Sequence, residues 1–203
     1  MPMKIILASQ SPRRKKLLEQ IGLTFEIIPS SVNEDISISD SNTMVQELAL
    51  RKALDVAKST SYSLIIGADT IVVHGNKVLG KPADYKEAFS TLSALSGNTH
   101  SVFTGVAFVE TDNSGKIIAQ HVFSVETKVT FGALATEEIE AYIATNSPMD
   151  KAGAYGIQDD WGAVFVERIE GDYNNVVGLP LFQLYKELKT FAPQALNHLV
   201  IPH

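Results

Sequence analysis

The run LIIGADTIVV at residues 64–73 constrains the fold more than any other part of the sequence. It is almost wholly apolar and rich in β-branched residues, which is typical of a strand whose two faces are both covered. The run therefore predicts a strand that is buried on both sides.

The remaining hydrophobic pattern alternates between helix and strand. Apolar residues at helical spacing predict helices at 12–22, 43–58, 85–95, 136–144 and 181–191. Short apolar or alternating runs predict further strands at 4–9, 24–28, 101–110, 116–131 and 163–169. This order of strands and helices predicts an α/β protein with a mixed central sheet and flanking helices. The length of 203 residues, with no internal repeat or linker, predicts one domain over residues 1–203.

Composition excludes several classes of function. The chain has no cysteine, which rules out disulfides, thiolate nucleophiles and Cys-containing zinc sites. A formal charge of -6 offers no general attraction to nucleic acid. No apolar run reaches the roughly 18 residues of a membrane span, and the basic residues 13–16 follow the first apolar run, the wrong order for a secretory signal. We therefore expect a soluble cytoplasmic protein, with the five histidines in structural or exposed positions.

The first candidate site is Ser9-Gln10-Ser11-Pro12-Arg13-Arg14, where a strand ends and a helix begins. Ser11 suits the N-cap and Pro12 the first helical position. Two arginines in a first helical turn are unfavourable beside the positive end of the helix dipole unless an anion joins them. Hydroxyls, backbone N–H groups and guanidiniums together could cradle a phosphate. A solvated charged turn is the alternative.

The second candidate is Asp69, a carboxylate within the apolar strand. Burial of this group without a partner would cost several kcal/mol. A divalent cation or a lysine would compensate it, and an aspartate so held could ligate a metal or act as a general base. The alternative is a structural aspartate bonded to backbone amides.

The third candidate is Lys52, which lies on the apolar face of the helix predicted at 43–58. A lysine at this position either reaches a buried anion or extends its ammonium to the surface. The sequence leaves both possibilities open.

Two further segments resemble ligand-binding loops. Residues 75–81, GNKVLGK, match the Walker A spacing, but Pro82 stands where Ser or Thr should bind magnesium, and the segment follows a predicted hairpin turn at 74–77. We reject a P-loop, although Lys81 could still bind phosphate as a single cation. In residues 150–158, DKAGAYGIQ, the glycines permit close approach of a ligand and Gln158 could read a base edge. A plain connecting loop is the alternative there.

Taken together, these segments resemble the Maf family of nucleotide pyrophosphatases along nearly the whole chain. The matching blocks agree in order and spacing: SQSPRR at 9–14, GADT at 67–70, GKP at 80–82, DKAGAYGIQ at 150–158 and NVVGLP at 175–180. Several blocks over some 170 residues are far more specific than any one motif. The resemblance implies a Maf/ITPase-like fold with a ligand cleft between two lobes, and a homodimer is the family expectation.

The resemblance also implies roles for individual residues. Asp69 would be the catalytic carboxylate, and Glu34 and Asp69 would hold a divalent cation, Mg²⁺ or Mn²⁺. The substrate-binding residues would be Ser9, Arg13, Arg14, Lys52, Thr70, Lys81 and Gln158. The implied reaction is attack of water on the α-phosphorus of a nucleoside triphosphate, with pyrophosphate leaving.

Three of these residues bear on the substrate. Arg13, Thr70 and Gln158 are similar to the branch of the family that hydrolyses dTTP and UTP, whereas the branch that prefers 7-methyl-GTP has Trp, Gln and Glu at these places. We therefore expect dTTP and UTP, or modified pyrimidine nucleotides, to be hydrolysed as a house-cleaning activity. Asp159 and Asp160 depart from the glycine that usually follows the glutamine.

Other functions stay open at this point. A nucleotide-binding regulator of septum formation would need no catalytic Asp69. A pyrophosphatase of 7-methyl-GTP or of inosine or xanthosine triphosphate would differ from our expectation in substrate alone.

Overall fold

The computed structural model describes residues 3–158, 161–197 and 199. The chain divides into two compact units. The first comprises Met1–Asp69, Thr104–Val125 and Gly178–His203, and the second comprises Thr70–Phe103 and Glu126–Val177. Three long strands pass from one unit into the other: β3 (Ser63–His74), β5 (Thr99–Thr111) and β6 (Ile117–Phe131).

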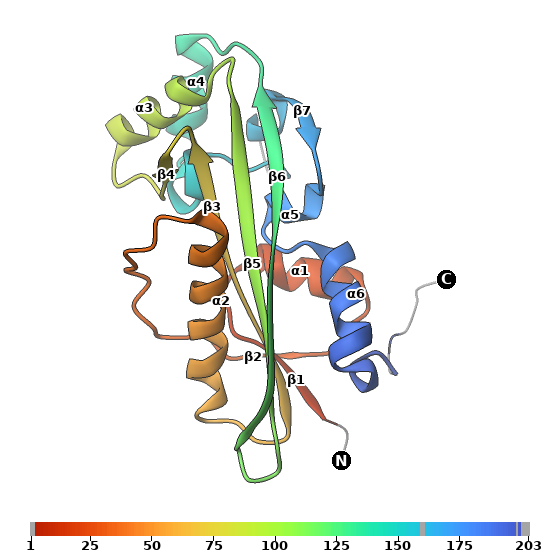
Figure 1. Ribbon diagram of the computed structural model, residues 1–203. Coiled ribbons are helices and arrows are strands. Elements are labelled where there is room, and N and C mark those ends of the chain that lie inside the picture. The colour runs from red at the N-terminus through yellow and green to blue at the C-terminus, as the bar shows by residue number, and fades with distance from the viewer. Residues whose placement is uncertain (1–2, 159–160, 198, 200–203) are drawn as a thin grey trace. The chain divides into compact units, whose positions relative to one another are not determined.

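The described strands form one mixed sheet in the order β2-β1-β3-β5-β6-β7, with β4 paired to β3 (Figure 1). The short strands β1 (Lys4–Leu7) and β2 (Glu26–Ile27) pair in parallel, and β1 also runs parallel to β3. The strands β4 (Lys77–Leu79) and β7 (Val166–Glu170) pair antiparallel with β3 and β6. The predicted mixed α/β fold is therefore confirmed.

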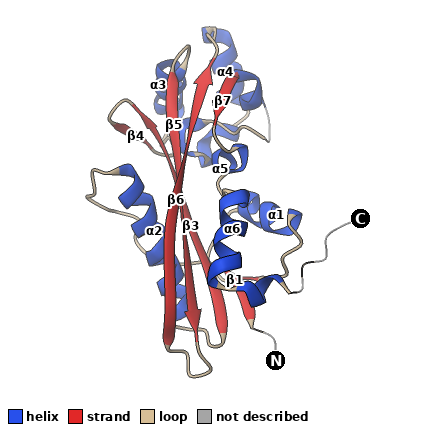
Figure 2. Ribbon diagram, turned by 45° about the vertical axis from the view of Figure 1, so that its right-hand side comes forward, coloured by secondary structure: helices blue, strands red, loops and turns tan. Residues whose placement is uncertain are grey.

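Helices cover both faces of the sheet in the first unit (Figure 2). The helix α2 (Ser41–Ala57) lies on one face, and α1 (Pro12–Gln20) and α6 (Leu181–Phe191) lie on the other. A 3-10 turn, Pro193–Leu196, follows α6. The predicted start holds at α1, where the Ser11 hydroxyl caps the helix, but the helix ends at Gln20, two residues before Gly22, which adopts a positive φ of 74°.

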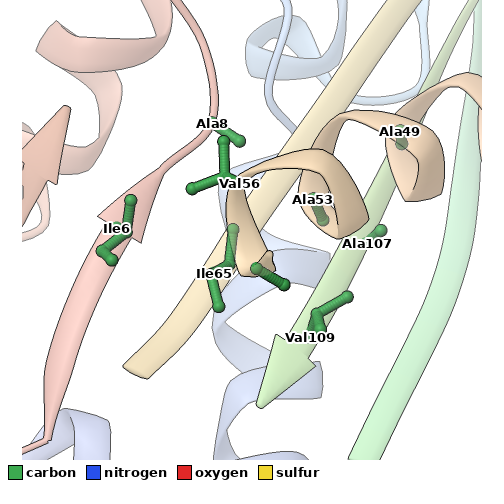
Figure 3. Packing of buried hydrophobic residues seen from close by; sticks show 9 residues of the cluster. Ile6, Ala8, Ala49, Ala53, Val56, Ile65, Ala107 and Val109 are labelled. Carbon is green, nitrogen blue, oxygen red and sulfur yellow. The ribbon is translucent and has the colours of Figure 1, made fainter. Parts of the chain in front are cut away.

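The core between α2 and the sheet is built from small and β-branched side chains (Figure 3). Its buried members are Ile6, Ala8, Ala49, Ala53, Val56, Ala57, Ile65, Ala107 and Val109. Two glycines let the helix backbone approach the strands directly. A Cβ added at Gly67 would lie 2.2 Å from the Ala49 carbonyl oxygen, and one at Gly105 would lie 2.2 Å from that of Val45. The position of α2 over β3 and β5 is therefore fixed by backbone contact.

Substituting Gly67 by alanine is expected to destabilise the protein by about 2 to 3 kcal/mol, because the new methyl group meets helix backbone that cannot turn aside. The measurement is the free energy of unfolding in urea. Gly132→Ala is the matched control, since a Cβ there meets nothing within 4 Å. Equal stability of the two variants would contradict the backbone contact.

The second unit contains the helices α3 (Tyr85–Leu95), α4 (Thr136–Ala144) and α5 (Tyr173–Val177). Short 3-10 turns, Ser147–Asp150 and Ala152–Ala154, follow α4. The strand predicted at 163–169 is wrong over its first three residues. A 3-10 turn occupies Trp161–Phe165, and β7 begins only at Val166, where pairing with Phe131 starts. Within the turn Gly162 packs tightly against the Gly156 backbone, so close packing rather than strand pairing sets the conformation there.

A buried histidine, His100, packs among aromatic rings in this second unit. His100 Nε2 is 2.8 Å from the Tyr155 hydroxyl, and both rings pack edge-on against Phe131. Burial, with a smaller contribution from His74, lowers the pKa of His100 from 6.5 to about 4. The imidazole is therefore neutral in the folded protein at neutral pH, as expected for a structural histidine.

This lowered pKa predicts loss of stability in acid. Between pH 6.5 and 4 the unfolded chain binds a proton at His100 that the folded protein excludes, so stability is complete above pH 6.5 and falls as pH decreases. The loss attributable to this group is about 3 kcal/mol between pH 7 and 4. His100→Gln keeps a polar group that does not titrate. Between pH 7 and 4, the free energy of unfolding of this variant in urea is expected to fall by about 3 kcal/mol less than that of the wild type. Parallel pH profiles for the two proteins would contradict the prediction.

Across the described residues, no helix is both long and apolar enough to span a membrane.

Candidate active site

Ser9, Arg13 and Arg14 lie where β1 leads into α1. The buried Ser9 accepts two hydrogen bonds at its Oγ, from the Ser11 backbone N–H at 3.2 Å and from Arg14 Nη1 at 3.2 Å. The Ser11 hydroxyl accepts from the Arg14 backbone N–H. The predicted juxtaposition of hydroxyls and a guanidinium group at a helix N-terminus is therefore present in the first unit, with Arg14 as the arginine that contacts Ser9.

The Arg14 guanidinium is held from two directions. Besides Ser9, it contacts the carbonyl oxygen of Gly178, to which its Nε donates at 2.9 Å. Burial lowers the pKa of Arg14 below its usual value, the Asp69 and Glu34 carboxylates oppose this shift, and the positive charge of Arg13 adds to it. An arginine remains protonated in proteins even so. Arg14 thus places a fixed positive charge within electrostatic range of two carboxylates.

Asp69 is buried and paired with a lysine. The Lys52 ammonium lies 2.6 Å from Asp69 Oδ1, and the two side chains are only 11% and 10% exposed. Of the partners that the sequence left open for Asp69, the structure supplies the lysine. It also shows that Lys52 reaches a buried anion and does not extend to the surface.

The backbone contact between α2 and β3 explains this pairing. Gly67 and Asp69 are two residues apart in a strand, so both face α2. Ala49 and Lys52 are three residues apart in α2, so both face the strand. Gly67 contacts Ala49. The side chains of Asp69 and Lys52, which follow these two residues in β3 and α2, therefore meet at the same interface between strand and helix.

Glu34 joins the same ammonium group from a loop. Its Oε1 lies 2.8 Å from Lys52 Nζ, although the Glu34 side chain is 64% exposed. The loop is anchored at Asp55, whose Oδ2 accepts from the backbone N–H of Ser31 and from the hydroxyls of Ser30 and Ser31. The bond from the Ser31 backbone N–H is the main reason that the pKa of Asp55 lies below its usual value. The sequence did not predict this anchoring role of Asp55, because nothing in the pattern distinguishes it from other polar residues of α2.

The donor chemistry of Asp69 and Glu34 suits a divalent cation. Their carboxylate oxygens converge on a single positive centre, the Lys52 ammonium. Magnesium is commonly bound by one or two carboxylates together with substrate phosphates and water. The two residues assigned to a metal by resemblance therefore fit such an ion. In the part of the chain that the structure describes, no group of three or more His, Asp and Glu side chains is placed to hold a metal.

The second unit contains the other predicted substrate-binding residues. Thr70 is the first residue of this unit and directly follows Asp69 in β3, Lys81 is exposed just after β4, and Gln158 is half-buried after the 3-10 turns. The Walker-like segment forms a β3–β4 hairpin whose turn contains Gly75 at a φ of 59°. This hairpin agrees with the rejection of a P-loop. Asp159 and Asp160 lie outside the described residues.

Lys151, in the block at 150–158, was not singled out in the sequence. It is buried, and its ammonium donates to the carbonyl and the hydroxyl of Ser147 and pairs with Asp150 at 2.9 Å. A Cβ at Gly156 would lie 2.7 Å from the Lys151 side chain, so the lysine packs closely against this glycine. This part of the block therefore serves to hold the loop in shape.

A separate cavity of about 560 Å³ lies at the other end of β1 in the first unit. Its described lining includes Ile5, Leu23, Phe25 and Ala195, and contains none of the predicted site residues. The candidate site is thus the charged cluster around Asp69.

Comparison with known sequences agrees with this geometry. Residues 4–191 match the family described as Maf-like protein. The chain belongs to the Maf family. Among its relatives in this family is a protein of Bacillus cereus named dTTP/UTP pyrophosphatase, which is 51% identical over 93% of this chain and 95% of its own length. Proteins with the same name from Bacillus anthracis and Bacillus thuringiensis subsp. konkukian are each 50% identical over the same shares.

Proposed function

We propose that this chain hydrolyses dTTP and UTP to the nucleoside monophosphate and pyrophosphate. The main support for the proposal is the buried Asp69, which pairs with Lys52 and lies within electrostatic range of Arg14. The chain also belongs to the Maf family, and its relatives are named dTTP/UTP pyrophosphatases. A buried carboxylate with cations around it suits a reaction in which water attacks a highly charged phosphate chain.

In this proposal Asp69 is the general base. Its carboxylate accepts a proton from the water that attacks the α-phosphorus, the bond from that phosphorus to the bridging oxygen breaks, and pyrophosphate leaves. Lys52, which also pairs with Glu34, holds the Asp69 carboxylate in position before substrate arrives. A divalent cation, Mg²⁺ or Mn²⁺, would be held by Asp69 and Glu34 and would polarise the phosphoryl oxygens when bound.

The phosphates are bound by the positive groups. Arg14 presents a guanidinium whose forked N–H groups suit phosphate oxygens, and Ser9 keeps it oriented. Lys52 and Lys81 would add two ammonium groups that bind as point charges. For Lys81, which belongs to the second unit, this role stays a prediction from the resemblance.

Selection of the base is assigned to Arg13, Thr70 and Gln158, again from the resemblance. Hydrogen-bonding groups at these positions suit a neutral pyrimidine better than a cationic methylated purine. A homodimer and a cytoplasmic location remain expectations of the same kind.

A substrate panel tests the proposal. The purified protein is mixed with dTTP, UTP, CTP, 7-methyl-GTP or ITP, with Mg²⁺ or Mn²⁺, and the release of pyrophosphate is measured. We expect release from dTTP and UTP only. Release from 7-methyl-GTP or ITP instead would overturn the assignment of substrate, and release from none of the five would overturn the assignment of activity.

A further inference from the structure

The Lys52 ammonium occupies the point at which the two candidate metal ligands converge. It lies 2.6 Å from Asp69 Oδ1 and 2.8 Å from Glu34 Oε1. A cation that bound both carboxylates would have to approach the same point. We propose that Lys52 is a built-in counter-cation that keeps divalent metal off Asp69 and Glu34 until a nucleotide phosphate draws the ammonium away. This inference rests on the proposed function, because it assumes that nucleotide and metal bind at this site.

The charge of the cluster supports this competition. Lys52 and Arg14 carry two positive charges, and Asp69 and Glu34 carry two negative charges. The Arg13 guanidinium adds a further positive charge near Arg14, so the two carboxylates offer a divalent cation no net negative charge, and in this partly buried setting like charges repel more strongly than in water. A triphosphate brings several negative charges and new acceptors for both side chains. Metal binding should therefore be weak alone and strong with nucleotide.

The two contacts of Lys52 differ in a way that permits exchange. Asp69 is held in a strand and is buried, whereas Glu34 lies on a loop with its side chain 64% exposed. The Lys52 backbone is fixed in α2, but its ammonium sits on a flexible stem of four carbons. The ammonium can thus rotate to a phosphate oxygen without movement of the helix, leaving two oriented carboxylates behind.

Linkage makes the consequence measurable. If metal and nucleotide favour the same arrangement of Lys52, each must raise the affinity for the other by the same factor. Removal of the Lys52 charge should then raise the affinity for metal in the absence of nucleotide, which is the opposite of what loss of a structural support would do.

The test measures the affinity of the protein for Mn²⁺ under conditions without turnover. Electron paramagnetic resonance monitors the concentration of free Mn²⁺ during the titration. For the wild type, the affinity for Mn²⁺ is expected to rise at least tenfold when α,β-methylene-UTP is present, after subtraction of the complex that Mn²⁺ forms with the analogue alone. Lys52→Met is expected to bind Mn²⁺ at least tenfold more tightly than the wild type without nucleotide. Lys186→Met, which removes an exposed lysine from α6 in the same unit, should behave as the wild type.

Thermal unfolding gives a second readout. Lys52→Met leaves Asp69 without its partner, so its Tm should fall without metal and should rise more with Mn²⁺ than the Tm of the wild type. If this variant does not fold, the wild-type comparison with and without the analogue still decides. Equal Mn²⁺ affinity in the two wild-type measurements, or an unchanged or lower affinity in a folded Lys52→Met protein, would overturn the inference. Neither result bears on the substrate panel, so the proposed function can stand or fail separately.

Discussion

Asp69→Asn is expected to lower kcat for dTTP hydrolysis by about a thousandfold or more. Asparagine keeps the size and one oxygen of the side chain but cannot accept the proton of the attacking water, and general base catalysis alone contributes about 10²- to 10⁴-fold. It is also a weaker ligand for a divalent cation. The measurement is the rate of pyrophosphate release at saturating dTTP and metal.

The matched control is Asp35→Asn, which removes a carboxylate from an exposed position next to Glu34 and should leave kcat unchanged. Asp69→Asn also takes a charged partner from the buried Lys52, so thermal unfolding must first show that the variant is folded. A folded Asp69→Asn protein with the wild-type rate would remove Asp69 from catalysis. It would favour the reading in which this aspartate is only structural.

Arg14→Lys is expected to reduce kcat/KM for dTTP by about 100- to 1000-fold, although the charge is retained. Lysine cannot hold the carbonyl of Gly178 and the hydroxyl of Ser9 while presenting a fork of donors to phosphate. Loss of a single oriented donor to developing negative charge costs about this much in other enzymes. Steady-state kinetics with dTTP provide the measurement.

Lys16→Ala is the control for this variant, since Lys16 is an exposed cation on the same helix. It should change kcat/KM less than twofold. A similar loss in both variants would mean that general positive charge on α1 attracts substrate. The specific geometry of Arg14 would then have no special role.

The periodic parts of the fold were predictable because local signals agreed with tertiary packing. The helix predicted at 85–95 and the one at 181–191 have the same bounds in the structure, and α1 differs only in its last turn. Short strands were less accurate. The strand predicted at 24–28 spans only Glu26–Ile27, and residues 163–165 form a 3-10 turn, because pairing partners rather than side-chain alternation decide where a strand begins.

Much of the candidate site was visible in the sequence as a violation of pattern. Asp69 in an apolar strand and Lys52 on an apolar helix face each needed a partner, and they proved to be partners of each other. The sequence did not predict the role of Gly67, since only the structure shows that this glycine lets the helix backbone lie against the strand. Glu34 lies in a loop without periodicity, so no local sequence signal predicted its contact with Lys52. The roles of Asp55 and Lys151 likewise depend on contacts with loop residues that the sequence pattern does not show.

In the proposed reaction, water activated at Asp69 attacks the α-phosphorus of dTTP. Hydrolysis of dTTP in water enriched in ¹⁸O, followed by mass spectrometry of both products, tests it most directly. If water attacks the α-phosphorus, each molecule of thymidine monophosphate will contain one ¹⁸O atom and pyrophosphate will contain none. Label in pyrophosphate, or release of inorganic phosphate in place of pyrophosphate, would contradict it.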